Sequence, residues 1–258
     1  GVLDHFDIGI NTNTNADVGD PLEDVPNHQA GSWLPSVTVI ARDAFGNHIS
    51  AFQDSVTLSL SAGGDVLTPV RVSLRDGFGS GLVWGVWRNS MRITRAGTGM
   101  TLIATDDIYG RTGVSNPFDV FAGPYDSLQL LLPGEIATPG ESPGKFGVPL
   151  PAVAGATVTV TLAALDVWWN PVSDQPLVHL ESSDYFELLS PNNVPLEADG
   201  TSDFDLLFKT ATTHTLSAWE LSNPAHIDSS DVEVVPGEFI RLMAVAPGET
   251  PEPGGPEV

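Results

Sequence analysis

Residues 37–47 read Val-Thr-Val-Ile-Ala-Arg-Asp-Ala-Phe-Gly-Asn, and residues 158–170 read Val-Thr-Val-Thr-Leu-Ala-Ala-Leu-Asp-Val-Trp-Trp-Asn. Both stretches begin with alternating apolar and polar side chains and end in an Asp that is followed four residues later by an Asn. Alternation with a period of two is typical of a half-buried β-strand, and Asp, Gly and Asn are typical of turns. Asp43 and Asp166 are 123 positions apart (166 − 43). The two stretches therefore predict that the same strand and turn occur twice in the chain.

A second pair of segments repeats elsewhere in the chain. Leu-Gln-Leu-Leu-Leu-Pro-Gly-Glu (128–135) recurs as Leu-Met-Ala-Val-Ala-Pro-Gly-Glu (242–249). Two landmarks in the same order indicate an internal repeat. We expect a first domain at 1–122, a second at 123–235, and at 236–258 the start of a third repeat or an exchanged strand or tail. We therefore expect the chain to be a piece of a longer array.

Short alternating segments fill both domains, and Gly 26 and Pro 21 supply turns between them. In the first domain they lie at 3–10, 37–42, 56–60, 70–74, 91–93, 100–104 and 118–120, and in the second at 158–164, 178–180, 204–208, 215–218 and 232–234. About seven strands in roughly 120 residues is the number found in a β-sandwich. The fold class is therefore all-β.

Three segments resemble a known group of proteins. The stretch at 37–47, the stretch Ile-Thr-Arg-Ala-Gly-Thr-Gly-Met-Thr-Leu-Ile-Ala-Thr-Asp (93–106) and the stretch Gly-Val-Ser-Asn-Pro-Phe-Asp-Val (113–120) resemble strands of bacterial Ig-like repeat domains of large surface and adhesin proteins, including the invasin/intimin-like group. The resemblance implies two tandem immunoglobulin-like Greek-key β-sandwiches plus the first strand of a third repeat. It also implies a stalk, adhesin or filament role.

The charge of the chain restricts its partners. Ten basic and 33 acidic side chains give a net charge of −23, and residues 123–258 carry 3 basic and 20 acidic groups. A field of this sign repels nucleic acid and anionic membranes. There is no cysteine, and no apolar run approaches the 18 to 20 residues of a membrane-spanning helix. We expect an extracellular or cell-surface fragment with no membrane insertion and no nucleic-acid partner.

No motif in the sequence predicts catalysis. The six histidines lack metal-ligand spacing, and neither a G-x-S-x-G nucleophile motif nor a phosphate-binding loop is present. We expect a protein that is not an enzyme and has no cofactor.

Calcium is the one ion that the sequence leaves open. Residues 11–20 and the acidic residues after them offer alternating oxygen ligands, and Asp17, Asp20 and Asp24 are the candidates. The spacing does not fit an EF-hand. The alternative is a solvated loop, and the turn at 43–47 has the same two interpretations.

Three tryptophans are candidates for an inter-domain interface. In an immunoglobulin-like topology, the turn that contains Trp168 and Trp169 lies at the end where the first strand enters the domain. The long loop that contains Trp33 would reach the same junction from the first domain. Aromatic side chains commonly anchor interfaces. The alternative is that one of Trp168 and Trp169 is buried within the second domain and the other is exposed.

The segment 239–246 is expected to form a strand without a domain of its own. Its apolar residues are candidates for strand exchange with an open sheet edge of another chain: Phe239, Ile240, Leu242, Met243 and Val245.

Two functions remain open from the sequence. The first is a non-enzymatic structural or adhesive module, a spacer or protomer of a cell-surface stalk or filament. Its partners would be neighbouring Ig-like domains or copies of itself, or a host or matrix glycan or protein. The alternative is a carbohydrate-binding accessory module of a secreted enzyme, since sugars stack on exposed aromatic rings. Trp84 and Trp87, three apart in one expected strand, would point to opposite faces and form no flat platform.

Overall fold

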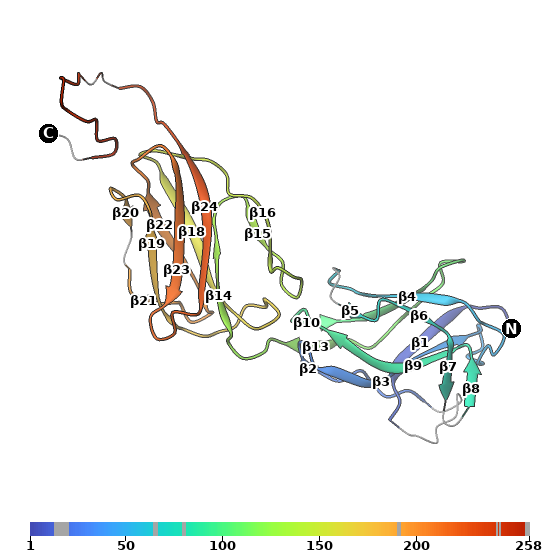
Figure 1. Ribbon diagram of the computed structural model, residues 1–258. Helices are drawn as coiled ribbons and strands as arrows, with labels where there is room; N and C mark the ends of the chain where they lie inside the picture. Colours follow the sequence, from blue (N-terminus) through green and yellow to red (C-terminus); the bar gives the residue numbers. More distant parts are fainter. Residues whose placement is uncertain are drawn as a thin grey trace. The chain divides into compact units, whose positions relative to one another are not determined.

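The computed structural model describes residues 1–12, 21–63, 67–78, 81–189, 192–240, 242 and 244–255, with backbone alone at 76–78 and 81–83. The described residues form strands and turns and contain no helix, so the all-β prediction is confirmed. The chain divides into two compact units, Gly1–Gly123 and Pro124–Val258 (Figure 1). Each is described by itself below.

The described residues of unit 1 form thirteen strands in three sheets. They are β1 (His5–Ile10), β2 (His28–Gln29), β3 (Trp33–Arg42), β4 (Ser55–Leu60), β5 (Leu67–Thr68), β6 (Arg71–Ser73), β7 (Arg75–Phe78), β8 (Gly81–Trp84), β9 (Val86–Ile93), β10 (Gly97–Met100), β11 (Leu102–Asp106), β12 (Thr112–Val114) and β13 (Phe118–Phe121). The sheets have the orders β1-β3-β9-β7-β8 with β5 on β9, β12-β11-β4-β6, and β10-β13-β2.

The described residues of unit 2 form eleven strands. They are β14 (Ser127–Leu131), β15 (Glu135–Ala137), β16 (Lys145–Gly147), β17 (Ala152–Val153), β18 (Thr157–Leu165), β19 (Leu177–Ser182), β20 (Leu188–Leu189), β21 (Val194–Pro195), β22 (Thr201–Leu207), β23 (Thr213–Glu220) and β24 (Ile227–Val235). The sheets have the orders β14-β18-β22-β20, β17-β24-β23-β19-β21 and β15-β16.

Both units have the strand order of an immunoglobulin sandwich. In unit 2 the order β14-β18-β22-β20 corresponds to strands A, B, E and D, and β24-β23-β19 to strands G, F and C. The short strand β17 runs parallel to β24, whereas the other strands of unit 2 pair antiparallel. In unit 1, β2 runs parallel to β13 in the same way. The predicted Greek-key sandwich is confirmed in both units.

The apolar positions of the strands form the core of each unit. In β14 and the residue after it, Leu128, Leu130 and Leu132 are buried, and in β18 Val158, Val160 and Leu162 are buried. Each set alternates with side chains on the other face, because successive residues of a strand point to opposite sides. The apolar positions that alternate in the sequence are thus the positions whose side chains form the core.

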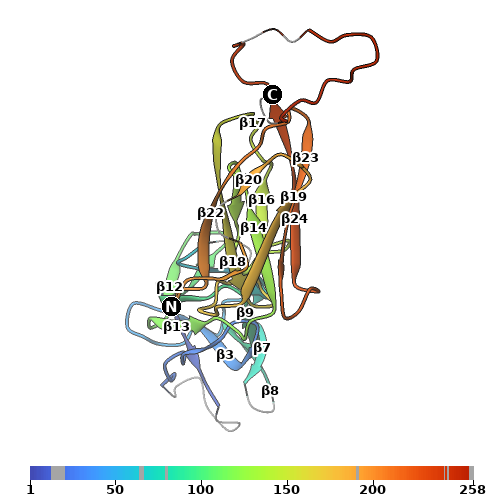
Figure 2. The ribbon, with the colours of Figure 1, turned by 90° about the vertical axis from the view of Figure 1, so that its left-hand side faces the viewer.

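The described residues of the C-terminal segment do not form the expected strand. The described residues after Val235 belong to no strand, and they extend beyond the end of β24 (Figure 2). A strand needs a neighbour to bind its backbone N–H and C=O groups, and no pairing is found for these residues. The turn after the expected strand is nevertheless present. Glu249 N–H donates to Ala246 C=O (3.0 Å) and the Glu249 carboxylate accepts from Ala246 N–H (2.9 Å).

The turn after β14 has the same hydrogen bonds as this C-terminal turn. There, Glu135 N–H donates to Leu132 C=O (3.0 Å) and the Glu135 carboxylate accepts from Leu132 N–H (2.9 Å). The two Pro-Gly-Glu segments of the sequence repeat therefore have the same local structure.

Candidate functional site

The Asp-x-x-x-Asn segments form the predicted turns. In unit 1, the Asp43 carboxylate accepts from the backbone N–H groups of Phe45 and Asn47 (2.9 Å each) and from the Asn47 amide (3.2 Å). These bonds, the backbone bond from Asn47 above all, lower the pKa of Asp43. In unit 2, Asp166 accepts from the N–H groups of Trp168 (2.8 Å) and Asn170 (2.9 Å). The turn interpretation is confirmed at both places.

The two turns differ in one residue that has structural consequences. The third residue after Asp43 is Gly46, with φ of 80°, and the third after Asp166 is Trp169, with φ of 60°. Positive φ is unfavourable for a bulky side chain. The Trp169 ring packs on Gly144, where a Cβ atom would overlap the indole. The second turn therefore makes a contact that the first one lacks.

Gly144 belongs to a hairpin that the sequence analysis did not predict. Strands β15 and β16 pair antiparallel within the long segment between β14 and β18. The hairpin is tied to the turn by a bond from Gly140 N–H to Trp168 C=O (2.8 Å), and to β14 by a bond from the Gln129 amide to Gly144 C=O (2.9 Å). Its loop end is therefore fixed to the rest of unit 2.

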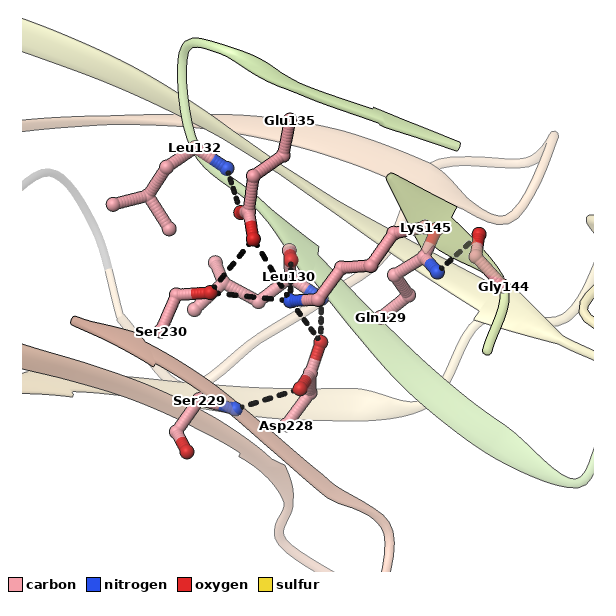
Figure 3. Close-up of polar contacts among 9 residues, drawn as sticks. All are labelled: Gln129, Leu130, Leu132, Glu135, Gly144, Lys145, Asp228, Ser229 and Ser230. Atoms are coloured by element: carbon pink, nitrogen blue, oxygen red, sulfur yellow. Dashed lines mark hydrogen bonds and ion pairs between the residues drawn. The ribbon is translucent and has the colours of Figure 1, made fainter. Parts of the chain in front are cut away.

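A lysine fixes the other side of the hairpin (Figure 3). Lys145 Nζ lies 3.0 Å from the Leu130 carbonyl, 3.1 Å from Asp228 Oδ2, 3.1 Å from Ser230 Oγ and 3.3 Å from Glu135 Oε1. The exposed fraction of the side chain is 22% for Lys145, 6% for Glu135 and 25% for Asp228. We call these residues the Lys145 clamp. It connects the hairpin to β14 and β24.

The carboxylates of the clamp have further donors. Glu135 accepts from Ser230 Oγ (3.0 Å) as well as from Leu132 N–H, and Asp228 Oδ2 accepts from Leu130 N–H (2.9 Å). Half-buried charges that are paired and hydrogen-bonded on several sides hold structure. We therefore interpret the clamp as a structural element that holds the hairpin in place. In the sequence its only signal was that Lys145 is one of three basic residues in 123–258.

The hairpin also exposes a group of apolar side chains. Ile136 and Phe146 lie directly opposite each other on β15 and β16, and Val148 and Leu150 follow on the chain. Their exposed fractions lie between 60% and 74%. We call these four residues the hairpin patch.

The predicted interface tryptophans lie at the linker ends of their own units. In unit 1, Ala30 N–H donates to the carbonyl of Phe121, the last residue of β13. Trp33, three residues further along, is 56% exposed, with the Arg92 guanidinium 5.2 Å from its ring centre. In unit 2, Ser127 pairs with Leu165, which places the turn of Trp168 and Trp169 where the chain enters. Both rings are partly buried. Their role in an interface stays a prediction.

The other predicted site residues stay untested. Asp17, Asp20 and Met243 lie outside the described residues. Asp24 is exposed, and within the described ranges no group of three or more His, Asp and Glu side chains is arranged to hold a metal ion. Calcium binding stays a prediction. So does strand exchange, for which the described candidates are all exposed: Phe239, Ile240, Leu242 and Val245.

The tryptophans form no platform for a sugar in the described part of the chain. Of the six, Trp33 alone is exposed. Trp84 and Trp87 are not in one strand as expected, because Gly85, with φ of 79°, separates β8 from β9. That prediction was wrong, since a strand-like run of apolar residues conceals a turn when its single Gly takes positive φ.

Two further polar groups support the ends of unit 2. Glu220 accepts from Tyr125 (3.1 Å) and contacts His226 (2.8 Å) and Ser222, which joins the start of β14 to the β23–β24 turn. Burial, followed by the Glu220 charge, raises the pKa of Tyr125.

At the other end, the Ser183 hydroxyl lies 3.2 Å from His214 Nδ1, and His214 Nε2 lies 2.8 Å from the Thr210 carbonyl. His214 is buried and stacked on Phe208. Neither Ser183 nor His214 lines the grooves of about 290 and 300 Å³ that are found in unit 2. We therefore interpret the pair as structural.

No helix in the described residues is long and apolar enough to cross a membrane.

Comparisons with known proteins give similar structures only. No protein family matches the chain, and no curated protein matches it. Among solved structures, the D0–D1 domain of intimin aligns with 81% of this chain and 94% of its own length, at 15% identity and a TM-score of 0.32. The Yersinia pseudotuberculosis adhesin InvE aligns with 81% of this chain and 56% of its own length (15%, 0.31), and domains 4–9 of the surface layer protein SbsC with 92% and 32% (17%, 0.30).

The aligned part thus spans about half of the InvE chain and about a third of the SbsC chain. At these identities and TM-scores the likeness supports no conclusion about family, activity or partners.

Proposed function

We propose that the chain is a non-enzymatic structural or adhesive module of the extracellular face of a cell, working as a spacer or protomer of a stalk or filament. The observation that carries the proposal is the Lys145 clamp together with the Trp169–Gly144 contact. These polar and aromatic groups attach the β15–β16 hairpin to β14, to β24 and to the turn that contains Trp169. Contacts that fix the local geometry in this way are suited to a rigid unit in a row of units.

The joint between units is the proposed functional element. Trp33 lies at the end of unit 1 where the chain leaves, and Trp168 and Trp169 lie at the end of unit 2 where it enters. We propose that these rings stiffen the joint. Other Ig-like domains or copies of the chain are the proposed partners. Residues 236–258, which repeat the β14 turn, are the proposed start of a third repeat or an exchanged strand.

Small-angle X-ray scattering of the whole chain tests the joint. Trp33→Ala and Trp168→Ala are expected to broaden the distribution of inter-unit distances relative to wild type. Trp219→Ala, which removes a ring that packs against His179 inside unit 2, is the control and should leave the distribution unchanged. A wild-type chain as flexible as the two variants would contradict a stiff joint.

A further inference from the structure

The hairpin has a polar inner side and an apolar outer side. On β15 and β16, Glu135 and Lys145 point into the clamp. Ile136 and Phe146, the next residue on each strand, are therefore on the opposite face, because side chains alternate along a strand. Val148 and Leu150 extend the apolar exposure along the chain. Apolar side chains grouped in this way on a protein surface commonly mark an interaction site.

The hairpin is also held more firmly than a surface loop requires. A two-stranded sheet is marginally stable alone in water. This one is fixed by the Lys145 clamp, by the Trp169 ring on Gly144, and by a bond from Leu150 N–H to the Pro133 carbonyl (2.7 Å). A rigid support lowers the entropic cost of binding at the surface that it presents.

We propose that the hairpin patch is a docking surface for a partner protein whose contact area is apolar at its centre and basic at its rim. The basic rim of the partner is inferred from the charge of the chain. Residues 123–258 contain 20 acidic and 3 basic side chains, and the charge of Lys145 is already matched by Glu135 and Asp228. A basic rim is attracted to this field, whereas the same patch of a second copy, which lies in an equally acidic unit, is repelled from this face.

The inference rests on the proposed function and deepens it, because it names the face through which an adhesive module would adhere. Four apolar side chains are enough for the centre of a small interface, in which a few buried residues contribute most of the affinity. A single contact of this size is weak and reversible. Several chains that present one patch each on the same surface would raise the avidity without a new contact.

The test measures binding of a defined peptide to the whole chain by calorimetry. The probe is a peptide of about 12 residues that alternates Phe or Leu with Lys. Its two counterparts replace Lys by Glu, or Phe and Leu by Ser. The double variant Ile136→Thr/Phe146→Thr keeps residues suited to strands and removes the apolar pair. Ile227→Thr, at an exposed apolar position of β24, is the matched control.

The Lys probe is expected to bind wild type, to bind the double variant at least about tenfold more weakly, and to bind Ile227→Thr as it binds wild type. Its affinity should fall as salt rises, and neither counterpart peptide should bind. A second pair, Val148→Thr/Leu150→Thr, should weaken binding in the same way and serves if the first variant is less stable.

Three outcomes would overturn the proposal. The first is that the Lys probe does not bind. The second is that wild type and both patch variants bind it equally, which would indicate general attraction to an acidic chain. The third is that wild type self-associates in a way that depends on Phe146, which would make a second copy the occupant. None of these changes the scattering result for the joint, so the two proposals fail separately.

Discussion

The indole of Trp169 lies on the backbone of Gly144, so closely that a Cβ atom on Gly144 would overlap Cδ1 and Cγ of the ring. Both residues have positive φ, 60° for Trp169 and 88° for Gly144. The left-handed conformation costs a residue with a Cβ atom about 1–2 kcal/mol. In unit 1 the same turn position is Gly46, which has open space around it. Unit 2 thus accepts a backbone cost at Trp169 and gains the contact that attaches the hairpin to the turn.

Replacing Gly144 by alanine should therefore destabilise unit 2 in two ways. The new methyl group would meet the Trp169 ring, and φ of 88° would be strained. We expect a loss of about 2–4 kcal/mol in the free energy of unfolding. The measurement is urea denaturation of the whole chain, followed through NMR amide signals of β18.

Gly155→Ala is the matched control, because Gly155 has φ of 86° and nothing within 4 Å of its added Cβ. It should lose only the backbone part, about 1 kcal/mol. If both variants lose the same amount, the ring contact contributes nothing.

The two Asp-x-x-x-Asn turns should respond differently to loss of the Asn. Asn170 is fully buried, and its amide bonds both oxygens of the buried Asp166 (3.2 and 3.0 Å). Asn170→Ala leaves that carboxylate with fewer donors, and we expect a loss of about 2 kcal/mol. Asn47→Ala removes bonds at an exposed turn, where water replaces them, so its loss should be smaller. Separate urea transitions of the two units give both values, and equal losses would contradict the role of burial.

The strands and turns could be read from the sequence because their causes are local. The alternation at 158–164 matches β18 (Thr157–Leu165), and an Asp that accepts nearby backbone N–H groups makes a turn wherever it occurs. The hairpin could not be read in this way. Its strands have three residues each, lie among Gly and Pro, and depend on a lysine that binds Asp228, 83 positions away.

The exposed face of the hairpin could not be foreseen for the same reason. The sequence shows Ile136 and Phe146 as isolated apolar residues within a long loop. Only the pairing of β15 with β16 brings them together, and the clamp and the Trp169 contact fix the other side of the hairpin to unit 2.

Removing the lysine of the clamp should release the hairpin. Lys145→Met keeps the length of the side chain and leaves Glu135 and Asp228 near each other without their cation. We expect unit 2 to lose about 2 kcal/mol, less than the 3–5 kcal/mol of a fully buried pair. Amide hydrogen exchange of residues 145–147 should accelerate more than exchange in β18. Lys145→Arg retains the charge and should preserve most of the protection. If Lys145→Met exchanges like wild type, the clamp does not hold the hairpin.

The stability of unit 2 should depend on pH through Glu220. Burial raises the pKa of this carboxyl, but hydrogen bonds from Ser222, His226 and Tyr125 outweigh burial, and the pKa lies below the ordinary 4.5. A carboxyl with a lowered pKa in the folded state favours folding above its unfolded pKa, and the contribution disappears as pH falls through the lower, folded value. Wild type should therefore exceed Glu220→Gln in stability at pH 6, and the difference should shrink below pH 4.5.

Urea denaturation at pH values from 6 to 3 measures this difference. Glu233→Gln is the control, because it removes one negative charge from an exposed position of β24 without touching the Tyr125 group. If Glu220→Gln lowers stability equally at every pH, the effect of the substitution comes from packing. The hydrogen bonds to the ionised carboxylate would then not stabilise the start of β14. If the difference grows as pH falls, the direction of the pKa shift is itself wrong, since a raised pKa would stabilise the protonated form in acid.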